Sequence, residues 1–297
     1  MAKNSPLLAG IELGGTKAVA VLARDGIIVD RMERLTAAAE PTLAALGDWL
    51  ADAETRHGPF AALGIASFGP LCLASGDPHH GCITATPKPG WSNVDVYDRF
   101  RQRFGRPVGL DTDVNAAALA EGRWGAARGA DVHAYLTIGT GVGLGLVVGG
   151  RAVHGAMHPE FGHIRVRRRS GDAFPGSCPW HGDCLEGLIS GKALAARAGT
   201  DPRTLAADHP LWSAVVDDLA EALAILMFTM SPQRIVIGGG VGLGQPQILA
   251  ALPQAVAQRL AGYQAGQCLI GHAELGADAG PLGAVVLAAN ALAQTAP

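Results

Sequence analysis

The stretch YLTIGTGVGLGLVVGGRAVHG, residues 135–155, decides the fold that we expect, because it joins two apolar runs through a glycine-rich turn. The second run then folds back at the pair Gly149 and Gly150. A similar arrangement opens the chain, where GIELGGTKAVAVLA, residues 10–23, contains a glycine pair and is followed by Asp25 and Gly26. Asp-Gly between two β-rich runs is typical of a hairpin with a type I′ turn. One such unit in each half predicts a duplicated supersecondary unit and two lobes.

Helical and strand patterns alternate around these two units. Helices are predicted at about residues 41–56 and 246–260, and GADAGPLGAVVLAANAL indicates another helix that closes the chain. The segments AALGIASFG, PVGLDTD and RIVIGGG are typical of strands. Alternating elements of this kind indicate an α/β protein with mixed sheets covered by helices. We place the boundary between the lobes near residues 111–113.

Composition excludes several classes of protein. The chain has 297 residues, with 23 Lys plus Arg against 26 Asp plus Glu, so no strong field exists to attract nucleic acid or an anionic membrane. The basic run of Arg165 and residues 167–169 is expected to be the solvated face of a strand. No apolar stretch approaches the length of a transmembrane helix, and the first ten residues are too weakly apolar for a signal peptide. Five cysteines, an odd number, favour reduced thiols in a cytoplasm.

The glycine turns ELGGTK and TIGTGVG are either plain tight turns or phosphate-binding turns. Glycine lets backbone N–H groups approach a phosphate without a Cβ in the way. A third run, IGGGVGLG from Ile237, would let a purine ring lie against bare backbone. Three glycine-rich turns of this kind in one chain favour a nucleotide-binding site over plain tight turns. The expected nucleotide-binding residues are Gly14, Gly15, Thr16, Lys17, Thr137, Gly139, Thr140, Gly141, Gly239 and Gly240.

The run CPWHGDC, residues 178–184, places three soft metal ligands close together: Cys178, His181 and Cys184. A structural zinc site uses four Cys or His ligands in a closed tetrahedron. Because a closed site leaves no position for water, the metal is expected to hold a loop rather than to do chemistry. The candidates for the fourth ligand are His163, His158, His79, His80, Cys72 and Cys82.

Taken in order, GIELGGTK, LDTDVNAAALAEGRWG, TIGTGVGLG, HPEFGH, CPWHGDCLEG and IVIGGG resemble the ROK family of bacterial sugar kinases, from about Gly10 to Ala289. The resemblance implies an actin-like, ribonuclease-H-like α/β ATPase fold with two lobes and duplicated βββαβαβα-type units. It also implies ATP and a sugar in an interlobe cleft. We expect an N-terminal lobe of residues 1–112, completed by a C-terminal helix at about 280–297. The C-terminal lobe would be residues 113–279, with a structural zinc loop at 163–184.

The motif TDVN carries the expected catalytic residue. Asp113 follows a predicted strand, so N-capping of a helix is its structural alternative. Phosphoryl transfer to an alcohol needs a carboxylate that accepts the proton, while Mg²⁺ and backbone donors stabilise the phosphoryl charge. The family pattern Asn-Asp-x-Asn implies that Asp113 is this base and that the residue before it holds a sugar hydroxyl. Here Thr112 replaces that Asn, and Asp111 is expected to be a structural or Mg²⁺-shell acid.

The resemblance also implies the fourth zinc ligand and the sugar contacts. His163 matches the family element Glu-x-Gly-His, which gives the ligand set His163, Cys178, His181 and Cys184, with a histidine where the family usually has a cysteine. Independently of the resemblance, Trp91 in TPKPGWSN either forms a pocket wall or lies in the core, and we favour the wall. The expected substrate-binding residues are Gly69, Thr112, Asp113, Glu160, His163 and Glu186.

The function that follows is an ATP-dependent hexose kinase with ATP, Mg²⁺ and a structural Zn²⁺. Glu12 before the glycine turn, TATPKPGW, TDVN, HPEFGH and the His-containing zinc run resemble the fructokinase branch more than the glucokinase branch. We therefore expect fructose 6-phosphate as the product, with a mannose or broad-specificity hexokinase as the alternative. A non-catalytic sugar-sensing protein is the alternative from another class, and a repressor would need a DNA-binding domain ahead of Gly10. The family implies a homodimer, and the cysteine usage indicates a cytoplasmic protein.

Overall fold

The computed structural model describes residues 5–264 and 268–295. It divides into two compact units. Unit 1 comprises the residues up to Trp124, Ala152–His158 and the residues from Ala277 onward. Unit 2 comprises Gly125–Arg151 and Pro159–Gly276.

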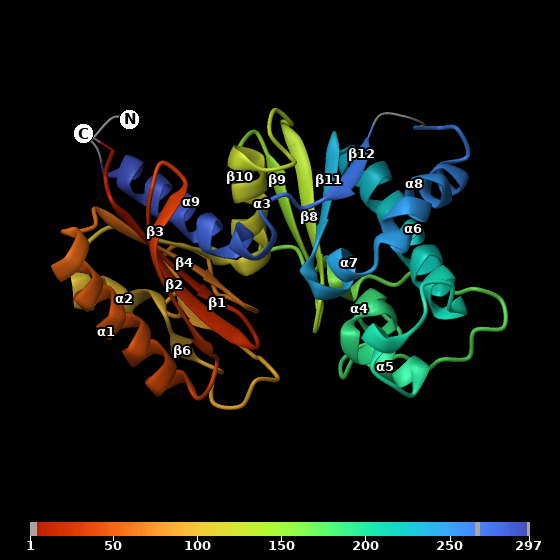
Figure 1. Cartoon of the computed structure of the whole chain (residues 1–297), viewed down its shortest axis with the longest axis horizontal. Helices are drawn as coiled ribbons and strands as arrows, with labels where there is room; N and C mark the ends of the chain where they lie inside the picture. The colour runs from red at the N-terminus through yellow and green to blue at the C-terminus, as the bar shows by residue number, and fades with distance from the viewer. Residues whose placement is uncertain (1–4, 265–267, 296–297) are drawn as a thin grey trace. The chain divides into compact units, whose positions relative to one another are not determined.

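Unit 1 is built on a five-stranded sheet with the order β3-β2-β1-β4-β7 (Figure 1). Its strands β1, β4 and β7 are parallel, whereas β2 and β3 form antiparallel hairpins at one side. The strands are β1 (Leu8–Leu13), β2 (Lys17–Arg24), β3 (Ile27–Leu35), β4 (Ala62–Ser67) and β7 (Val108–Thr112), with a small sheet of β5 (Cys82–Ile83) and β6 (Val94–Asp95). The helices are α1 (Ala39–His57), α2 (Tyr97–Phe104), α3 (Asp113–Trp124) and α9 (Ala279–Gln294).

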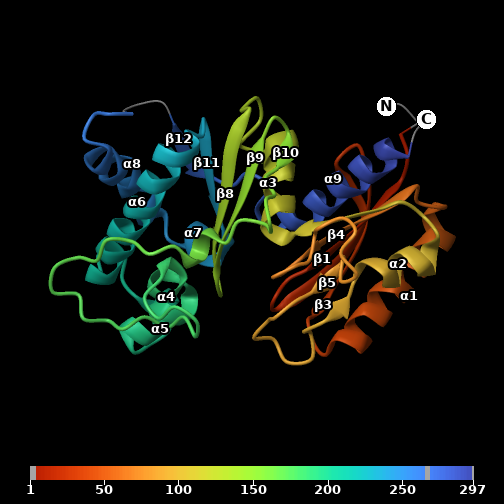
Figure 2. The same ribbon diagram turned by 180° about the vertical axis from the view of Figure 1, so that it is seen from behind.

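The alternation of side chains along β2 explains why this sheet is covered on both faces. Leu22 and its period-two neighbours pack with α1, while Val21 and its neighbours pack with α9. Figure 2 shows α1 and α2 along one side of the sheet and α9 along the other. Gly283 permits the close approach of α9 to α3, because a Cβ there would lie 2.2 Å from the Ala116 carbonyl oxygen.

One sequence expectation is corrected by α9. The helical segment Gly276–Gln294 is long and apolar enough to cross a membrane, although no such stretch was expected. In unit 1 it packs on β1 and β4, and 61% of its apolar window is buried. This helix is therefore apolar because it forms part of the core.

Unit 2 repeats the arrangement with the order β10-β9-β8-β11-β12. Here β8, β11 and β12 are parallel, and β9 returns antiparallel to β8. The strands are β8 (Val132–Ile138), β9 (Val142–Val148), β10 (Arg151–Ala152), β11 (Arg234–Gly238) and β12 (Leu269–His272). The helices are α4 (Leu185–Ile189), α5 (Gly191–Ala198), α6 (Pro210–Met230), α7 (Gly239–Gly244) and α8 (Pro246–Leu260). The predicted duplication is confirmed.

The two hairpin turns form as predicted. Asp25 and Gly26 have φ of 49° and 78°, and Gly149 and Gly150 have φ of 58° and 73°. A positive φ at both central residues is what a type I′ turn requires, and Gly and Asp tolerate it best. The same turn therefore closes β2–β3 and β9–β10.

Two local expectations differ from the structure, and by contacts the boundary between the units falls one element later than expected. The predicted strand RIVIGGG ends at Gly238, and the run that follows forms the short helix α7, although glycine is a poor helix former. Residues 165–169 form no strand, and Arg168 instead bonds Asp183 at 3.1 Å and the Phe174 carbonyl at 2.8 Å. By contacts, α3 lies in unit 1 because it packs on α9, whereas we expected the lobe boundary before it.

Candidate functional site

The carboxyl ends of the parallel strands of unit 1 gather the first group of expected site residues. Leu13 of β1 is in register with Ser67 of β4, and Ser67 with Thr112 of β7. The segments that follow these three strands therefore begin side by side, at the edge where open α/β sheets bind ligands. These segments are the turn Gly14–Thr16, the loop containing Gly69, and the start of α3 at Asp113.

Asp113 is the first residue of α3 and is half-buried, and its Oδ1 accepts a hydrogen bond from Val114 N at 2.9 Å. The capping role falls to Thr112, whose Oγ1 accepts from Asn115 N at 3.2 Å. Burial raises the pKa of Asp113 to about 6. A carboxylate with a pKa this close to neutrality can accept a proton from an alcohol and return it to water.

Glu12, near the end of β1, is the titratable residue that the sequence analysis missed as a site residue. Its Oε2 is inaccessible to solvent and has no hydrogen-bond partner in the part of the chain that the structure describes. Burial and then the charge of Asp113 raise the pKa of Glu12 to about 7. An acid in an otherwise apolar strand was the available signal. Two carboxylates thus share this sheet edge.

The glycine turn of unit 1 is closed by Gly14, whose N–H donates to the Lys17 carbonyl at 2.9 Å. Thr16 and Gly15 are exposed in this turn. The ammonium group of Lys17 lies 3.2 Å from Glu33 Oε2 on β3. The turn therefore presents backbone, while its lysine is paired with a neighbouring strand.

Two contacts fix the loop that contains Gly69. Leu71 N donates to His158 Nε2 at 3.1 Å, and the Phe68 ring packs on Trp91 with centroids 5.2 Å apart. Trp91 is fully buried, and its Nε1 donates to the Ala37 carbonyl at 2.9 Å. The expectation that Trp91 forms a pocket wall is wrong, because it is a core residue beneath this loop.

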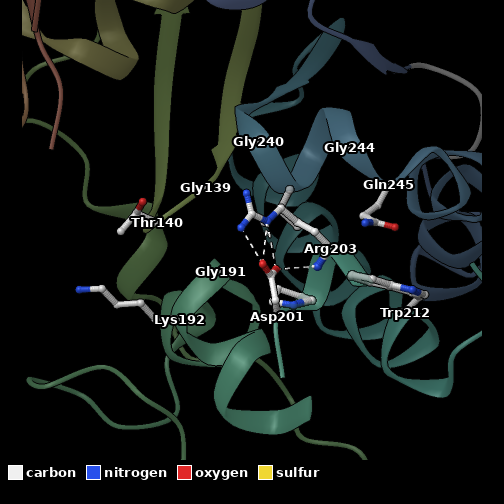
Figure 3. Close-up of a pocket in the computed structure, with 12 residues that line it drawn as sticks. Gly139, Thr140, Gly191, Lys192, Asp201, Arg203, Trp212, Gly240, Gly244 and Gln245 are labelled. Carbon is white, nitrogen blue, oxygen red and sulfur yellow. Dashed lines mark hydrogen bonds and ion pairs between the residues drawn. The ribbon is translucent and has the colours of Figure 1, made fainter. Parts of the chain in front are cut away.

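In unit 2, a cavity of about 630 Å³ lies at the ends of β8 and β11 (Figure 3). Three of the expected nucleotide-binding residues line it: Gly139, Thr140 and Gly240. Gly139 accepts a hydrogen bond from Gly191 N at 2.7 Å, which docks the first residue of α5 against this turn. Of the other expected residues, Thr137 is the last but one of β8, Gly239 begins α7, and Gly141 shares the Gly139 turn.

Further lining residues come from segments that the sequence analysis did not connect with nucleotide binding. Figure 3 shows Lys192 and Thr140 on one side of the cavity, and Trp212 with Gln245 on the other. Arg203 NH2 lies 2.6 Å from Asp201 Oδ2, and this pairing lowers the pKa of Asp201 to about 2. Their contribution depends on how helices pack, so no local pattern could have revealed it.

Glu186 and Glu160, both expected near the sugar, flank the metal ligands in unit 2. Glu186 Oε2 accepts a hydrogen bond from Val142 N at 3.0 Å, so Glu186 braces the TIGTGVG turn. A Cβ at Gly141 would lie 2.7 Å from this oxygen, which explains the glycine. Glu160 is exposed and precedes the short 3₁₀ helix Phe161–His163.

The expected metal ligands meet in unit 2: one ligand atom each from His163, Cys178, His181 and Cys184 lie within 4.8 Å of one another. His163 Nδ1 lies 3.6 Å from Cys184 Sγ and 3.8 Å from Cys178 Sγ. Tetrahedral zinc ligands at about 2.0–2.3 Å from the metal lie roughly 3.3–3.8 Å apart, so the donor set fits zinc. The other candidates for the fourth position belong to unit 1 and do not join this cluster.

Comparison with known proteins gives consistent matches. The ROK family model matches residues 8–291. A fructokinase of Zymomonas mobilis is 40% identical over 295 residues, which are 96% of this chain and 98% of that protein. The crystal structure of a ROK hexokinase from Thermus thermophilus has a TM-score of 0.81 at 30% identity, over 97% of this chain and 99% of its own. That of a ROK family glucokinase from Streptomyces griseus has a TM-score of 0.77 at 28% identity, over 96% and 99%. These likenesses confirm the expected actin-like ATPase fold.

Proposed function

Because the chain belongs to the ROK family and is an ATP-dependent hexose kinase, we propose that its substrate is fructose, which it phosphorylates on the 6-hydroxyl. The observation that carries this choice is the 40% identity with the Zymomonas mobilis fructokinase over nearly the whole of both chains. The sequence features TDVN and HPEFGH support the same branch. A broad-specificity hexokinase is an alternative, because a ROK hexokinase is also among the similar structures, and mannose is the main competing sugar.

Asp113 is the proposed general base. It takes the proton of the sugar hydroxyl as the hydroxyl oxygen bonds to the γ-phosphorus of ATP and the bond to the β-phosphate oxygen breaks. Its raised pKa of about 6 suits this role, since the group is ionised at neutral pH but still basic. The capping hydrogen bond made by Thr112 supports the assignment, because the carboxylate of Asp113 is not needed for that bond.

ATP is proposed to occupy the cavity of unit 2. The backbone at Gly240 and at the second residue of α5 offers N–H groups to phosphates, whereas the N–H groups of Gly139 and Gly191 already donate to the carbonyls of Gly141 and Gly139. Lys192, the second residue of α5, adds a positive charge on the same side of the cavity. Trp212 and Gln245 line the other side, where a purine could stack and hydrogen-bond. The Streptomyces griseus glucokinase was crystallised with AMPPNP, which supports an adenine nucleotide here.

The carboxylates of unit 1 fit a magnesium ion. Glu12 Oε2 is a buried acceptor without a partner among the described residues, and Mg²⁺ takes oxygen ligands. We assign Glu12 as the group that holds Mg²⁺, directly or through water. When bound, Mg²⁺ neutralises charge on the phosphoryl oxygens. A nearby cation would also lower the pKa of Glu12 from about 7, so that this side chain binds in its ionised form.

Zinc at the Cys₂His₂ cluster is proposed to be structural. Four protein ligands fill the tetrahedron, which leaves no position for water or sugar. The metal would tie the 3₁₀ helix ending at His163 to the loop of Cys178 and Cys184. Glu160 and Glu186 flank these ligands, and together with Gly69, Thr112 and His163 they are the proposed sugar contacts. We also propose that the protein is a homodimer, as the family implies, and cytoplasmic, as its cysteine usage indicates.

The test of the proposed function is a comparison of kcat/KM for fructose, mannose, glucose and N-acetylmannosamine with ATP and Mg²⁺. Fructose is expected to give the highest value. The site of phosphorylation is read from the product by ³¹P and ¹³C NMR. A higher value for glucose or for an N-acetyl sugar would overturn the choice of fructose, and absence of turnover with every hexose would overturn the kinase assignment.

A further inference from the structure

The segment Ala152–His158 belongs to unit 1, although it follows directly from the first residue of β10 in unit 2. Two histidines attach it to the strand ends described above. His158 accepts the hydrogen bond from Leu71 N, beside the Gly69 loop. His154 contacts Asp111, near the end of β7 and two residues before the proposed base. The segment thus joins the edge where the sugar is expected.

Asp111 is a buried carboxylate with several donors around it. Its Oδ1 accepts hydrogen bonds from Thr112 N at 2.7 Å and from Asn115 Nδ2 at 2.8 Å. His154 Nε2 lies 3.0 Å from Oδ2 and 3.1 Å from Oδ1. Only 4% of the Asp111 side chain is exposed, against 40% of the His154 side chain. A buried acid therefore holds an imidazole whose outer part reaches solvent.

This contact fixes the chemistry of the other ring nitrogen. A carboxylate can only accept, so Nε2 of His154 carries a proton and donates it. The hydrogen bond to Asp111, together with the charge of that carboxylate, also raises the pKa of His154, which increases the imidazolium fraction near neutrality. Nδ1 makes no hydrogen bond to any of the described residues. It is thus an oriented polar atom, able to accept from a hydroxyl or, in the imidazolium form, to donate to one.

Because Thr112 replaces the Asn of the family pattern, one expected hydrogen bond to the sugar lacks its side chain, and the imidazole of His154 can supply it. The residue is 3% exposed, and its Oγ1 already accepts the capping hydrogen bond from Asn115 N. The family pattern has Asn at this position, and its longer amide side chain offers a sugar both a donor and an acceptor, whereas Thr112 offers one short hydroxyl. Asp111 and Asp113 are only two residues apart in the chain, so their Cα atoms lie within about 7 Å of each other although Asp113 already belongs to α3. A hexose with its reacting hydroxyl at Asp113 therefore spans the distance to a group anchored on Asp111.

We propose that His154, oriented by Asp111, is a specificity-determining residue that hydrogen-bonds a hydroxyl of fructose through Nδ1. The proposal rests on the proposed kinase function and adds a residue to its sugar site. Asp111 acts through His154 and is a positioning residue. A structural clamp between the segment and β7 is the competing explanation, and the experiment has to separate the two.

The test compares His154→Gln with the matched control His57→Gln. His57 is also a partly exposed histidine of unit 1 paired with an aspartate, since its Nε2 lies 2.8 Å from Asp30 Oδ2. Loss of one sugar hydrogen bond should raise KM for fructose about tenfold with kcat within roughly threefold. KM for ATP and the melting temperature should stay unchanged. Asp111→Asn should raise KM for fructose less, because it only loosens the ring. His154→Asn serves as the second variant if His154→Gln does not fold.

A double-mutant-type cycle, in which wild type and His154→Gln are each assayed on fructose and on 1-, 3- and 4-deoxyfructose, then identifies the hydroxyl that His154 binds. If His154 binds one hydroxyl, the wild type loses activity on the analogue that lacks it, whereas His154→Gln shows no further loss on that analogue. An equal loss on fructose and on every analogue would overturn the proposal in favour of a clamp. So would a KM for fructose within twofold of wild type. If wild-type protein prefers another hexose, the proposed function fails separately, and the same cycle on deoxy forms of that sugar decides the role of His154.

Discussion

Unit 1 and unit 2 place their parallel strands in the same order, yet the ends of those strands differ in chemistry. In unit 1 they carry the carboxylates of Glu12 and Asp113, both with raised pKa values because they are buried. In unit 2 they carry Gly139 and Gly240 around a cavity of about 630 Å³. In the proposed mechanism a duplicated backbone divides one reaction, with acid–base chemistry on one sheet edge and nucleotide binding on the other.

The largest effect is expected at the carboxylate edge. Asp113→Asn removes the proton acceptor, so kcat should fall about 10³-fold while the fold and sugar binding remain. Asp52→Asn, an exposed residue of α1, is the control. In the wild type, kcat should also fall as the pH drops through about 6, because Asp113 becomes protonated. Near-normal kcat in Asp113→Asn would remove Asp113 from the mechanism.

The glycine edge should respond differently. A Cβ at Gly240 would meet nothing within 4 Å, so Gly240→Ala should fold normally while its methyl group projects into the cavity. We expect KM for ATP to rise about tenfold, with kcat within roughly threefold. Gly271→Ala, on β12 with equally open space, is the matched control. If both variants had a normal KM for ATP, the nucleotide would have to bind elsewhere.

The metal cluster lies in unit 2 only, so its loss should affect stability more than chemistry. Purified protein should contain one zinc per chain by elemental analysis, and Cys178→Ser should lose the metal and melt at a lower temperature. Cys268→Ser, outside the cluster, should keep the metal. Wild-type protein without stoichiometric zinc would contradict this assignment. Retention of zinc by His163→Ala would move the fourth ligand to another residue.

The smallest effect concerns the charge of Glu12. Its pKa is raised from 4.5 to about 7, so its contribution to stability is fully present below pH 4.5 and is lost as the pH rises through about 7. Glu12→Gln keeps the shape without the charge. In a chelator, its melting temperature should exceed that of wild type by a few degrees at pH 8, and the difference should shrink at pH 5. If the difference in melting temperature between Glu12→Gln and wild type were the same at both pH values, ionisation of Glu12 would not be its cause.

Much of the fold could be predicted because its signals are local. Asp25 and Gly26 specify their turn by backbone preference, and the helix at residues 246–260 begins at a proline and follows an apolar period. By contrast, the glycine-rich segment Gly239–Gly244 forms a helix against its propensity. A Cβ at Gly239 would lie 2.4 Å from the Ile138 carbonyl oxygen of the adjacent strand, which explains the glycine at that position. Close packing with β8 decides this segment, and its own sequence does not.

The site residues also fall into those that local sequence could predict and those that depend on the packing of distant segments. Cys178, His181 and Cys184 are neighbours in sequence, so their joint role was visible from spacing. Lys192 and His154 belong to the site because they meet residues that are distant in the sequence: Lys192 lines the cavity, and His154 contacts Asp111. No local sequence pattern could have predicted these contacts. Trp91 was misjudged because an aromatic residue in a proline-rich loop has no pattern that separates core from pocket wall.

The division between the two sheet edges is tested most directly by measuring kcat and KM for ATP of Asp113→Asn and Gly240→Ala side by side under identical conditions. Asp113→Asn should lose kcat about 10³-fold at an unchanged KM for ATP, and Gly240→Ala should show a raised KM with kcat nearly retained. Loss of the same parameter in both variants would contradict the assignment of chemistry to unit 1 and nucleotide binding to unit 2.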